Sequence, residues 1–165
     1  WYTYFGNFEA NAANQTLAAS WYEAGIQCIF VAAGPAGASV FAAAEATTDG
    51  KVIGVDSDQY QESDRIISSA IKDLKRVTMN EIDAWNKGTW KGGETVRLTA
   101  AEEGVALPME HSKWVNFTQA DYDDLYTRLA NDTDGLASSI PVDTTADTPA
   151  ELASRWPHVN LTYTE

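Results

Sequence analysis

The stretch from Cys28 to Asp58 constrains the fold most, because two apolar runs of strand length flank a glycine-containing turn and a short helical run. The apolar runs are Cys28–Ala33 and Val52–Val55. Parallel strands need a crossover connection, usually a helix, so this order predicts a βαβ unit. Ligands of such units bind at the carboxyl ends of the strands. The Gly34–Gly37 turn and the carboxylate of Asp56 both fall there.

Further segments extend this unit into an alternating α/β chain. Asp73 is suited to cap a helix that ends near Gly88, and Thr118 with Asp121 resembles a capping box at the start of a last helix. The short runs around the acidic turn 102–104 could form either a hairpin or a chain crossing. The predicted strands are 2–5, 26–33, 52–55, 66–71, 94–98 and 105–107, the earlier helices are 11–24 and 38–46, and one or two further helical turns are predicted at 150–155.

Composition limits the classes of function that remain. A chain of 165 residues with 44% hydrophobic content can bury one ordinary core. Its formal charge of −13 and pI near 4.4 oppose binding to nucleic acid or anionic lipid, since phosphate binding relies on Lys and Arg. The single cysteine, Cys28, excludes an intrachain disulfide and a thiolate metal cluster, and its apolar neighbours indicate a small core residue.

Catalytic motifs are missing from the sequence. His111 and His158 lie far from any Gly-x-Ser-x-Gly or His-Glu-x-x-His pattern, so hydrolase and metalloenzyme interpretations lack their reactive groups, and both histidines are interpreted as surface residues. No metal site is predicted. The Gly34–Gly37 turn matches a dinucleotide fingerprint poorly, although amides at a helix N-terminus could hold a polar group of a ligand.

Three side chains near predicted strand ends are candidates for ligand contact. Asp56 could accept hydrogen bonds from two adjacent hydroxyls of a sugar, although acids such as Asp56 and Asp58 also favour turns. Lys72 could reach the same crevice as a donor, and its alternative is a solvent-facing position. Phe8 is either part of the core or an exposed platform for a flat ring. A sugar-bearing molecule is the ligand class that these residues suit.

Five blocks of sequence resemble one family along most of the chain. They are Tyr-Phe-Gly-Asn-Phe at 4–8, Ala-Ala-Gly-Pro-Ala-Gly-Ala-Ser-Val-Phe at 32–41, Ile-Gly-Val-Asp-Ser-Asp-Gln at 53–59, Ser-Ala-Ile-Lys at 69–72 and Gly-Thr-Trp-Lys-Gly-Gly at 88–93. These blocks resemble the basic membrane protein family, the substrate-binding lipoproteins of ABC importers, many of which are specific for purine nucleosides. The resemblance extends to about Val142.

The resemblance implies a domain organisation. It implies the Rossmann-like three-layer αβα lobe of a type I periplasmic binding protein. Residues 1–142 would form the second, carboxy-terminal lobe, including hinge-crossing segments near 99–109. Residues 143–165 would be an irregular tail, and the amino-terminal lobe is expected to be absent from this chain.

The same resemblance implies roles for particular residues. Phe8 would stack on the nucleobase, Asp56 would accept from the ribose hydroxyls, Lys72 would be their donor partner, and Gly34 and Gly37 would form the loop that approaches the ligand. Pro35 stands where the family usually has glycine, which removes one amide donor. No cofactor is implied.

The leading hypothesis is therefore a non-catalytic nucleoside-binding lobe, with a purine nucleoside favoured, that serves an ABC permease. Its expected location is extracytoplasmic, as a membrane-anchored lipoprotein or a periplasmic protein whose anchor lies outside this chain. One alternative is a small α/β enzyme with a nucleotide or flavin cofactor on the Gly34–Gly37 loop. Another is a sensor domain that shares the binding fold. An isolated lobe would also expose apolar faces, which favours self-association.

Overall fold

A mixed sheet of four strands, in the order β1-β2-β3-β4, organises the chain. The computed structural model describes residues 1–140. Strands β1 (Cys28–Phe30), β2 (Lys51–Asp56) and β3 (Ile66–Lys72) are parallel, and β4 (Val105–Ala106) pairs antiparallel with the end of β3. The predicted α/β class with a parallel βαβ unit is confirmed.

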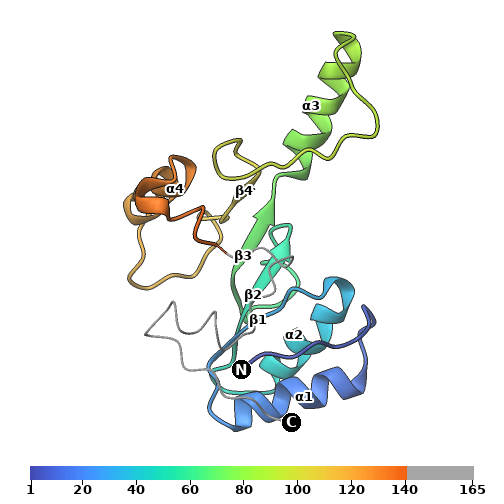
Figure 1. Cartoon of the computed structure of the whole chain (residues 1–165). Coiled ribbons are helices and arrows are strands. Elements are labelled where there is room, and N and C mark those ends of the chain that lie inside the picture. The colour runs from blue at the N-terminus through green and yellow to red at the C-terminus, as the bar shows by residue number, and fades with distance from the viewer. Residues whose placement is uncertain (141–165) are drawn as a thin grey trace.

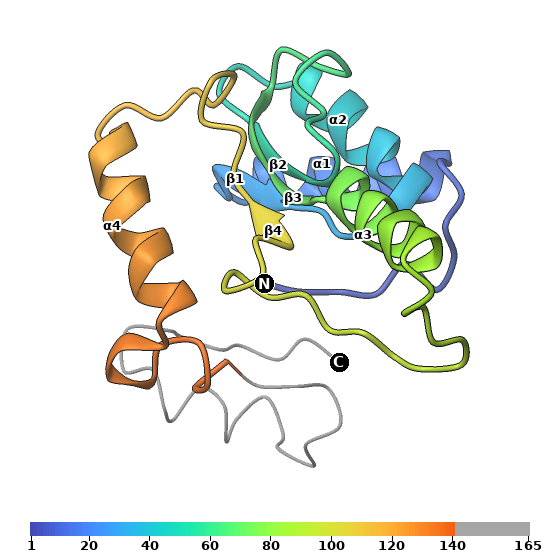
Figure 2. The same ribbon diagram turned by 90° about the horizontal axis from the view of Figure 1, so that it is seen from above.

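Four α-helices accompany the sheet within residues 1–140, and they differ in how well they are covered. Helices α1 (Ala12–Glu23) and α2 (Gly37–Glu45) lie side by side below the strands in Figure 1. Helix α3 (Leu74–Asn86) continues away from the end of β3, and α4 (Gln119–Ala130) stands apart from α1 and α2 (Figures 1 and 2). Two short 3₁₀ turns complete the described elements, η1 (Gly34–Ala36) and η2 (Thr133–Gly135).

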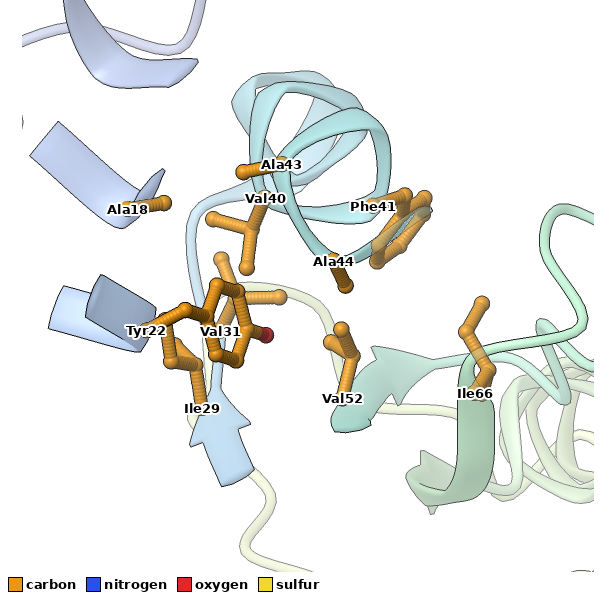
Figure 3. Packing of buried hydrophobic residues seen from close by; sticks show 10 residues of the cluster. All are labelled: Ala18, Tyr22, Ile29, Val31, Val40, Phe41, Ala43, Ala44, Val52 and Ile66. Carbon is orange, nitrogen blue, oxygen red and sulfur yellow. The ribbon is translucent and has the colours of Figure 1, made fainter. Parts of the chain in front are cut away.

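The hydrophobic core lies between α1, α2 and the first three strands. Val40 of α2, Val52 of β2 and Ile66 of β3 are almost completely buried, and Figure 3 shows them among the side chains of the core cluster. Small residues of α2, including Ala44, allow the helix to approach the sheet closely. This core fixes the parallel strands, and therefore the positions of their carboxyl ends.

Tyr22 connects α1 to the sheet through a polar contact inside this core. Its hydroxyl donates a 2.8 Å hydrogen bond to the carbonyl of Lys51, and burial raises the pKa of its phenol well above the ordinary value. The ring belongs to the core cluster.

Tyr22→Phe keeps the ring and removes this hydrogen bond, so we expect it to lower the free energy of unfolding by about 1 kcal/mol. Urea denaturation measures the change. Tyr4→Phe is the matched control, because Tyr4 is exposed and should tolerate the loss of its hydroxyl. Equal stabilities of the two variants would show that the Tyr22 hydroxyl contributes nothing.

Two strand predictions are wrong. The segment 2–5 forms no ladder, because a cavity of about 740 Å³ separates it from β1, and Trp1 packs edge-on against Trp21 instead. Residues 94–98 are also not a strand, so β4 pairs with β3 and no hairpin forms around the acidic turn. Both predictions relied on local composition, whereas a ladder needs a neighbouring backbone at about 4.8 Å.

The prediction for Cys28 is also wrong, because this residue is exposed. Strand β1 alternates between exposed and buried side chains, and Cys28 and Phe30 point away from the core. The predicted helical turns at 150–155 and the predicted tail lie outside the described residues.

The two predicted helix caps are confirmed, and the structure adds a third. The side chain of Asp73 accepts from the amide of Arg76 at the start of α3, and Thr118 and Asp121 form the reciprocal capping box of α4. Hydrogen bonds from Thr118 hold the pKa of the Asp121 carboxyl below its ordinary value. Asn11 caps α1 in the same way by accepting from the amide of Asn14.

Candidate functional site

A cavity of about 670 Å³ opens at the carboxyl ends of β2 and β3. Four of the five predicted site residues line it, namely Phe8, Gly34, Asp56 and Lys72. They come from the amino-terminal segment, the turn after β1 and the ends of two adjacent strands. The parallel sheet therefore brings together residues that are up to 64 positions apart in the sequence (72 minus 8).

Asp56 and Lys72 form an ion pair at the opening of this cavity. The Lys72 Nζ atom lies 2.7 Å from Asp56 Oδ1, and the two side chains are 65% and 45% exposed, respectively. Exposed pairs of this kind contribute only about 0–1 kcal/mol to stability. The pair is accessible, so both charges can contact a ligand.

Asp56 has an unusual backbone conformation. Its φ of 68° lies in the left-handed region, which only glycine, asparagine and aspartate adopt with ease. The turn that follows is fixed by Gln59, whose Oε1 accepts a 2.9 Å hydrogen bond from the amide of Val55. This geometry sets the direction in which the Asp56 carboxylate leaves the sheet.

Phe8 and Gly34 form a second wall of the cavity. Phe8 is 72% exposed, so the interpretation of Phe8 as a core residue is wrong and its ring is accessible as a platform. Gly34 has a φ of +53°, and a Cβ atom placed on it would lie 3.5 Å from Cδ1 of Phe8. The aromatic ring therefore rests against the glycine backbone.

Gly37 lies elsewhere. It begins α2, is buried, and faces Phe41 and Val31 instead of the cavity. Within the turn before it, the amide of Ala36 donates to the carbonyl of Ala33, and the amide of Gly37 donates to carbonyls of the turn. Pro35 has no amide hydrogen, and the amides of Ala36 and Gly37 are already bonded. Three of the four residues of this turn therefore offer no free N–H to a phosphate.

Helix α4 supplies a wall that sequence analysis did not assign to the site. Its residues Tyr122, Leu125, Tyr126 and Leu129 line the cavity. The hydroxyl of Tyr122 accepts from the amide of Leu107 at 3.3 Å, and that of Tyr126 donates to the carbonyl of Val105 at 3.0 Å. Desolvation raises the pKa of the Tyr126 phenol. The helical spacing of these residues was visible in the sequence, but what they face was not.

His111 is partly buried, whereas a surface position was predicted. Its ring is only 35% exposed, and Nδ1 lies 2.6 Å from Oδ2 of Asp58, on the loop after β2. A contact across 53 positions in the sequence leaves no local signal. His158 lies outside the described residues.

Two further observations concern only residues 1–140. No group of three or more His, Cys, Asp or Glu side chains there is arranged to hold a metal ion. No helix in the same range is both long and apolar enough to cross a membrane.

Comparisons with known proteins place this geometry in a family. The sequence profile of the Bmp family, described as ABC transporter substrate-binding protein PnrA-like, matches residues 1–129. The chain is 31% identical to basic membrane protein D of Borreliella burgdorferi over 119 residues, covering 70% of this chain and 35% of that protein. It is 29% identical to the ABC transporter nucleoside-binding protein BmpA of Lactococcus lactis over 126 residues, covering 66% and 36%.

Solved structures support the fold. A transcriptional activator of the comK gene from Bacillus halodurans matches with a TM-score of 0.61 and 14% identity, over 78% of this chain and 44% of that one. An ABC transporter solute-binding protein from Aeropyrum pernix K1 matches with a TM-score of 0.53 and 21% identity, over 92% of this chain and 38% of that one.

The chain spans little more than a third of the length of the two curated relatives. The chain thus belongs to the basic membrane protein family of ABC transporter substrate-binding proteins.

Proposed function

We propose that this chain is one lobe of a two-lobed protein that binds a nucleoside, with a purine nucleoside favoured, and delivers it to an ABC permease. The observation that carries the proposal is the cavity in which an accessible aromatic ring, Phe8, and an accessible ion pair, Asp56–Lys72, share one opening. A nucleoside offers a flat base and a ribose diol, which are the two groups that this combination can recognise. The name of the Lactococcus relative supports the same ligand class.

Each residue has a defined role in this proposal. The Asp56 carboxylate accepts hydrogen bonds from the two ribose hydroxyls, Lys72 donates to a ribose oxygen, and Phe8 stacks on the base. Gly34 lets the chain approach the ligand because it has no side chain. Charge-assisted hydrogen bonds contribute about 1.5–3 kcal/mol each, and stacking about 1–3 kcal/mol per base. Gly37 supports the ligand loop only by starting α2.

The exposed apolar surface on α3 is an argument for a second lobe, which would cover it. Leu74, Ile82 and Trp85 are each at least half exposed, and no residue of α3 is buried. A 13-residue helix is marginal in water without packing on an apolar face. We assign residues 1–142 to the carboxy-terminal lobe and place the crossings between lobes near 99–109, where β4 returns to the sheet beside β3.

The proposal is non-catalytic and extracytoplasmic. Binding followed by release to a permease requires no nucleophile, metal or cofactor, and the internally bonded Gly34–Gly37 turn is poorly suited to a nucleotide or flavin phosphate. A membrane-anchored lipoprotein or a periplasmic protein would present the cavity to nucleosides outside the cell.

Ligand titration followed by NMR tests this proposal on the 165-residue chain. We expect guanosine and inosine to shift the resonances of Phe8, Asp56 and Lys72 saturably. Ribose alone should bind more weakly, by about tenfold or more, because it cannot stack. Phe8→Ala should reduce the affinity for guanosine to that for ribose and leave ribose binding unchanged. Equal binding of ribose and guanosine by the unmodified chain, or shifts confined to other residues, would contradict the assignment.

A further inference from the structure

The loop between β2 and β3, residues 57–65, is fastened to a distant segment, residues 108–113. Asp58 Oδ2 and His111 Nδ1 are 2.6 Å apart, and their side chains are only 23% and 35% exposed. Because an ionised carboxylate only accepts, Nδ1 of His111 donates this hydrogen bond. The ring of Tyr60 stacks on His111, with centroids 3.8 Å apart and planes 12° from parallel. We call Asp58, Tyr60 and His111 the latch.

The segment that carries His111 is itself held against the sheet. The amide of Lys113 donates to the carbonyl of Ile67 in β3 at 2.7 Å, and the hydroxyls of Ser112 and Ser68 are 2.8 Å apart. Lys113 Nζ also donates to the carbonyl of Asp64 at the far end of the loop. His111 therefore lies on a fixed support, and the latch holds the loop to β3.

The latched loop follows Asp56 directly. Only Ser57 separates Asp56 from Asp58, and Asp58 Oδ1 also accepts from the amide of Tyr60 at 3.4 Å. Aspartate tolerates the left-handed conformation of Asp56, and contacts on both sides of this residue hold the turn in that conformation. The latch supplies contacts on the loop side, and Gln59 supplies them on the strand side.

We propose that Asp58, Tyr60 and His111 are positioning residues that hold the Asp56 carboxylate in the direction needed for ligand contact. The proposal rests on the ligand role proposed above for Asp56. None of the three lines the cavity, so each acts through the loop. The hydrogen bond fixes Asp58, and the stacked ring fixes Tyr60, so two points of one short turn are held at once.

Two substitutions of His111 separate the two contacts. His111→Asn places an amide N–H near the position of Nδ1 and keeps the hydrogen bond to Asp58. His111→Phe keeps a ring for Tyr60 to stack on but has no donor, so Asp58 loses its partner. Glu110→Gln is the control, because Glu110 is exposed beside His111 and makes no side-chain hydrogen bond or ion pair within residues 1–140.

Hydrogen–deuterium exchange measures how fast the loop amides exchange, and titration measures the affinity for guanosine, both on the full 165-residue chain. In His111→Phe we expect the amides of residues 57–62 to exchange about tenfold faster and the affinity for guanosine to fall about tenfold, the size expected for one charge-assisted hydrogen bond. His111→Asn, which loses only the stacked ring, should show a smaller effect of up to about threefold in both readouts, because the charged hydrogen bond remains. Glu110→Gln should change neither.

The outcomes separate the two proposals. Unchanged exchange in His111→Phe would overturn the latch, and so would faster exchange with an unchanged affinity for guanosine. If the unmodified chain binds no guanosine, the ligand proposal fails, and the latch is then judged by the amide resonance of Asp56. That resonance must move most in His111→Phe, less in His111→Asn and not at all in Glu110→Gln, and any other pattern overturns the latch.

Discussion

Asp56→Asn is expected to weaken nucleoside binding about a hundredfold, because two hydrogen bonds from the ribose hydroxyls lose their charged acceptor. The substitution should leave the fold intact. Asparagine adopts the left-handed conformation as readily as aspartate, and the exposed pair with Lys72 contributes only about 0–1 kcal/mol to stability. Titration with guanosine and thermal unfolding measure the two effects separately.

Asp83→Asn provides the matched control for this variant. It removes another exposed ion pair, between Asp83 and Lys87 on α3, away from the cavity lining. We expect its affinity for guanosine to equal that of the unmodified chain. Full retention of guanosine affinity by Asp56→Asn would remove Asp56 from the ligand site.

Ile66→Ala is expected to lower the free energy of unfolding by about 3 kcal/mol, because its side chain is completely buried and its loss leaves a cavity. Ile66 begins β3 and packs in the core beneath α2 (Figure 3). Urea denaturation measures the change, with the slope of the transition as a check that cooperativity is retained.

The same substitution on α3 gives a contrasting result. Ile82 is 50% exposed, so Ile82→Ala should change the stability of this chain by no more than about 0.5 kcal/mol. A loss as large as that of Ile66→Ala would mean that the α3 face is covered in solution, by a second copy of the chain. The concentration dependence of unfolding would then identify that association.

Local signals explain which elements were predictable. The cap at Asp73 and the capping box at Thr118 each need only four consecutive residues, and both predicted helices begin where expected. The parallel strands were predictable for a similar reason, since β2 reads as one apolar run between polar turns. Their shared carboxyl edge brings Asp56 and Lys72 together. Topology made this approach possible but left a solvent-facing position open for Lys72, and the family resemblance implied the pairing.

Features that depend on distant neighbours were not predictable. The exposure of Cys28 follows from the alternation of β1, which turns this side chain away from the core, and the partial burial of His111 accompanies its contact with Asp58. Neither leaves a pattern in the surrounding sequence. Tyr122 and Tyr126 read as an ordinary apolar helix face, and only the tertiary structure shows that they border the cavity.

The path of the chain after β3 has a mechanical consequence. Lys72 is the last residue of β3, α3 starts at Leu74, and the chain returns at Gly104, whose carbonyl accepts from the amide of Asp73 at 3.0 Å. The two ends of segment 73–104 are therefore joined beside the ion pair. Because α3 is about 20 Å long, a small rotation at Lys72 becomes a larger displacement at the far end of the helix. Segment 73–104 would therefore act as a lever arm whose pivot lies at Lys72, a residue of the proposed ligand site.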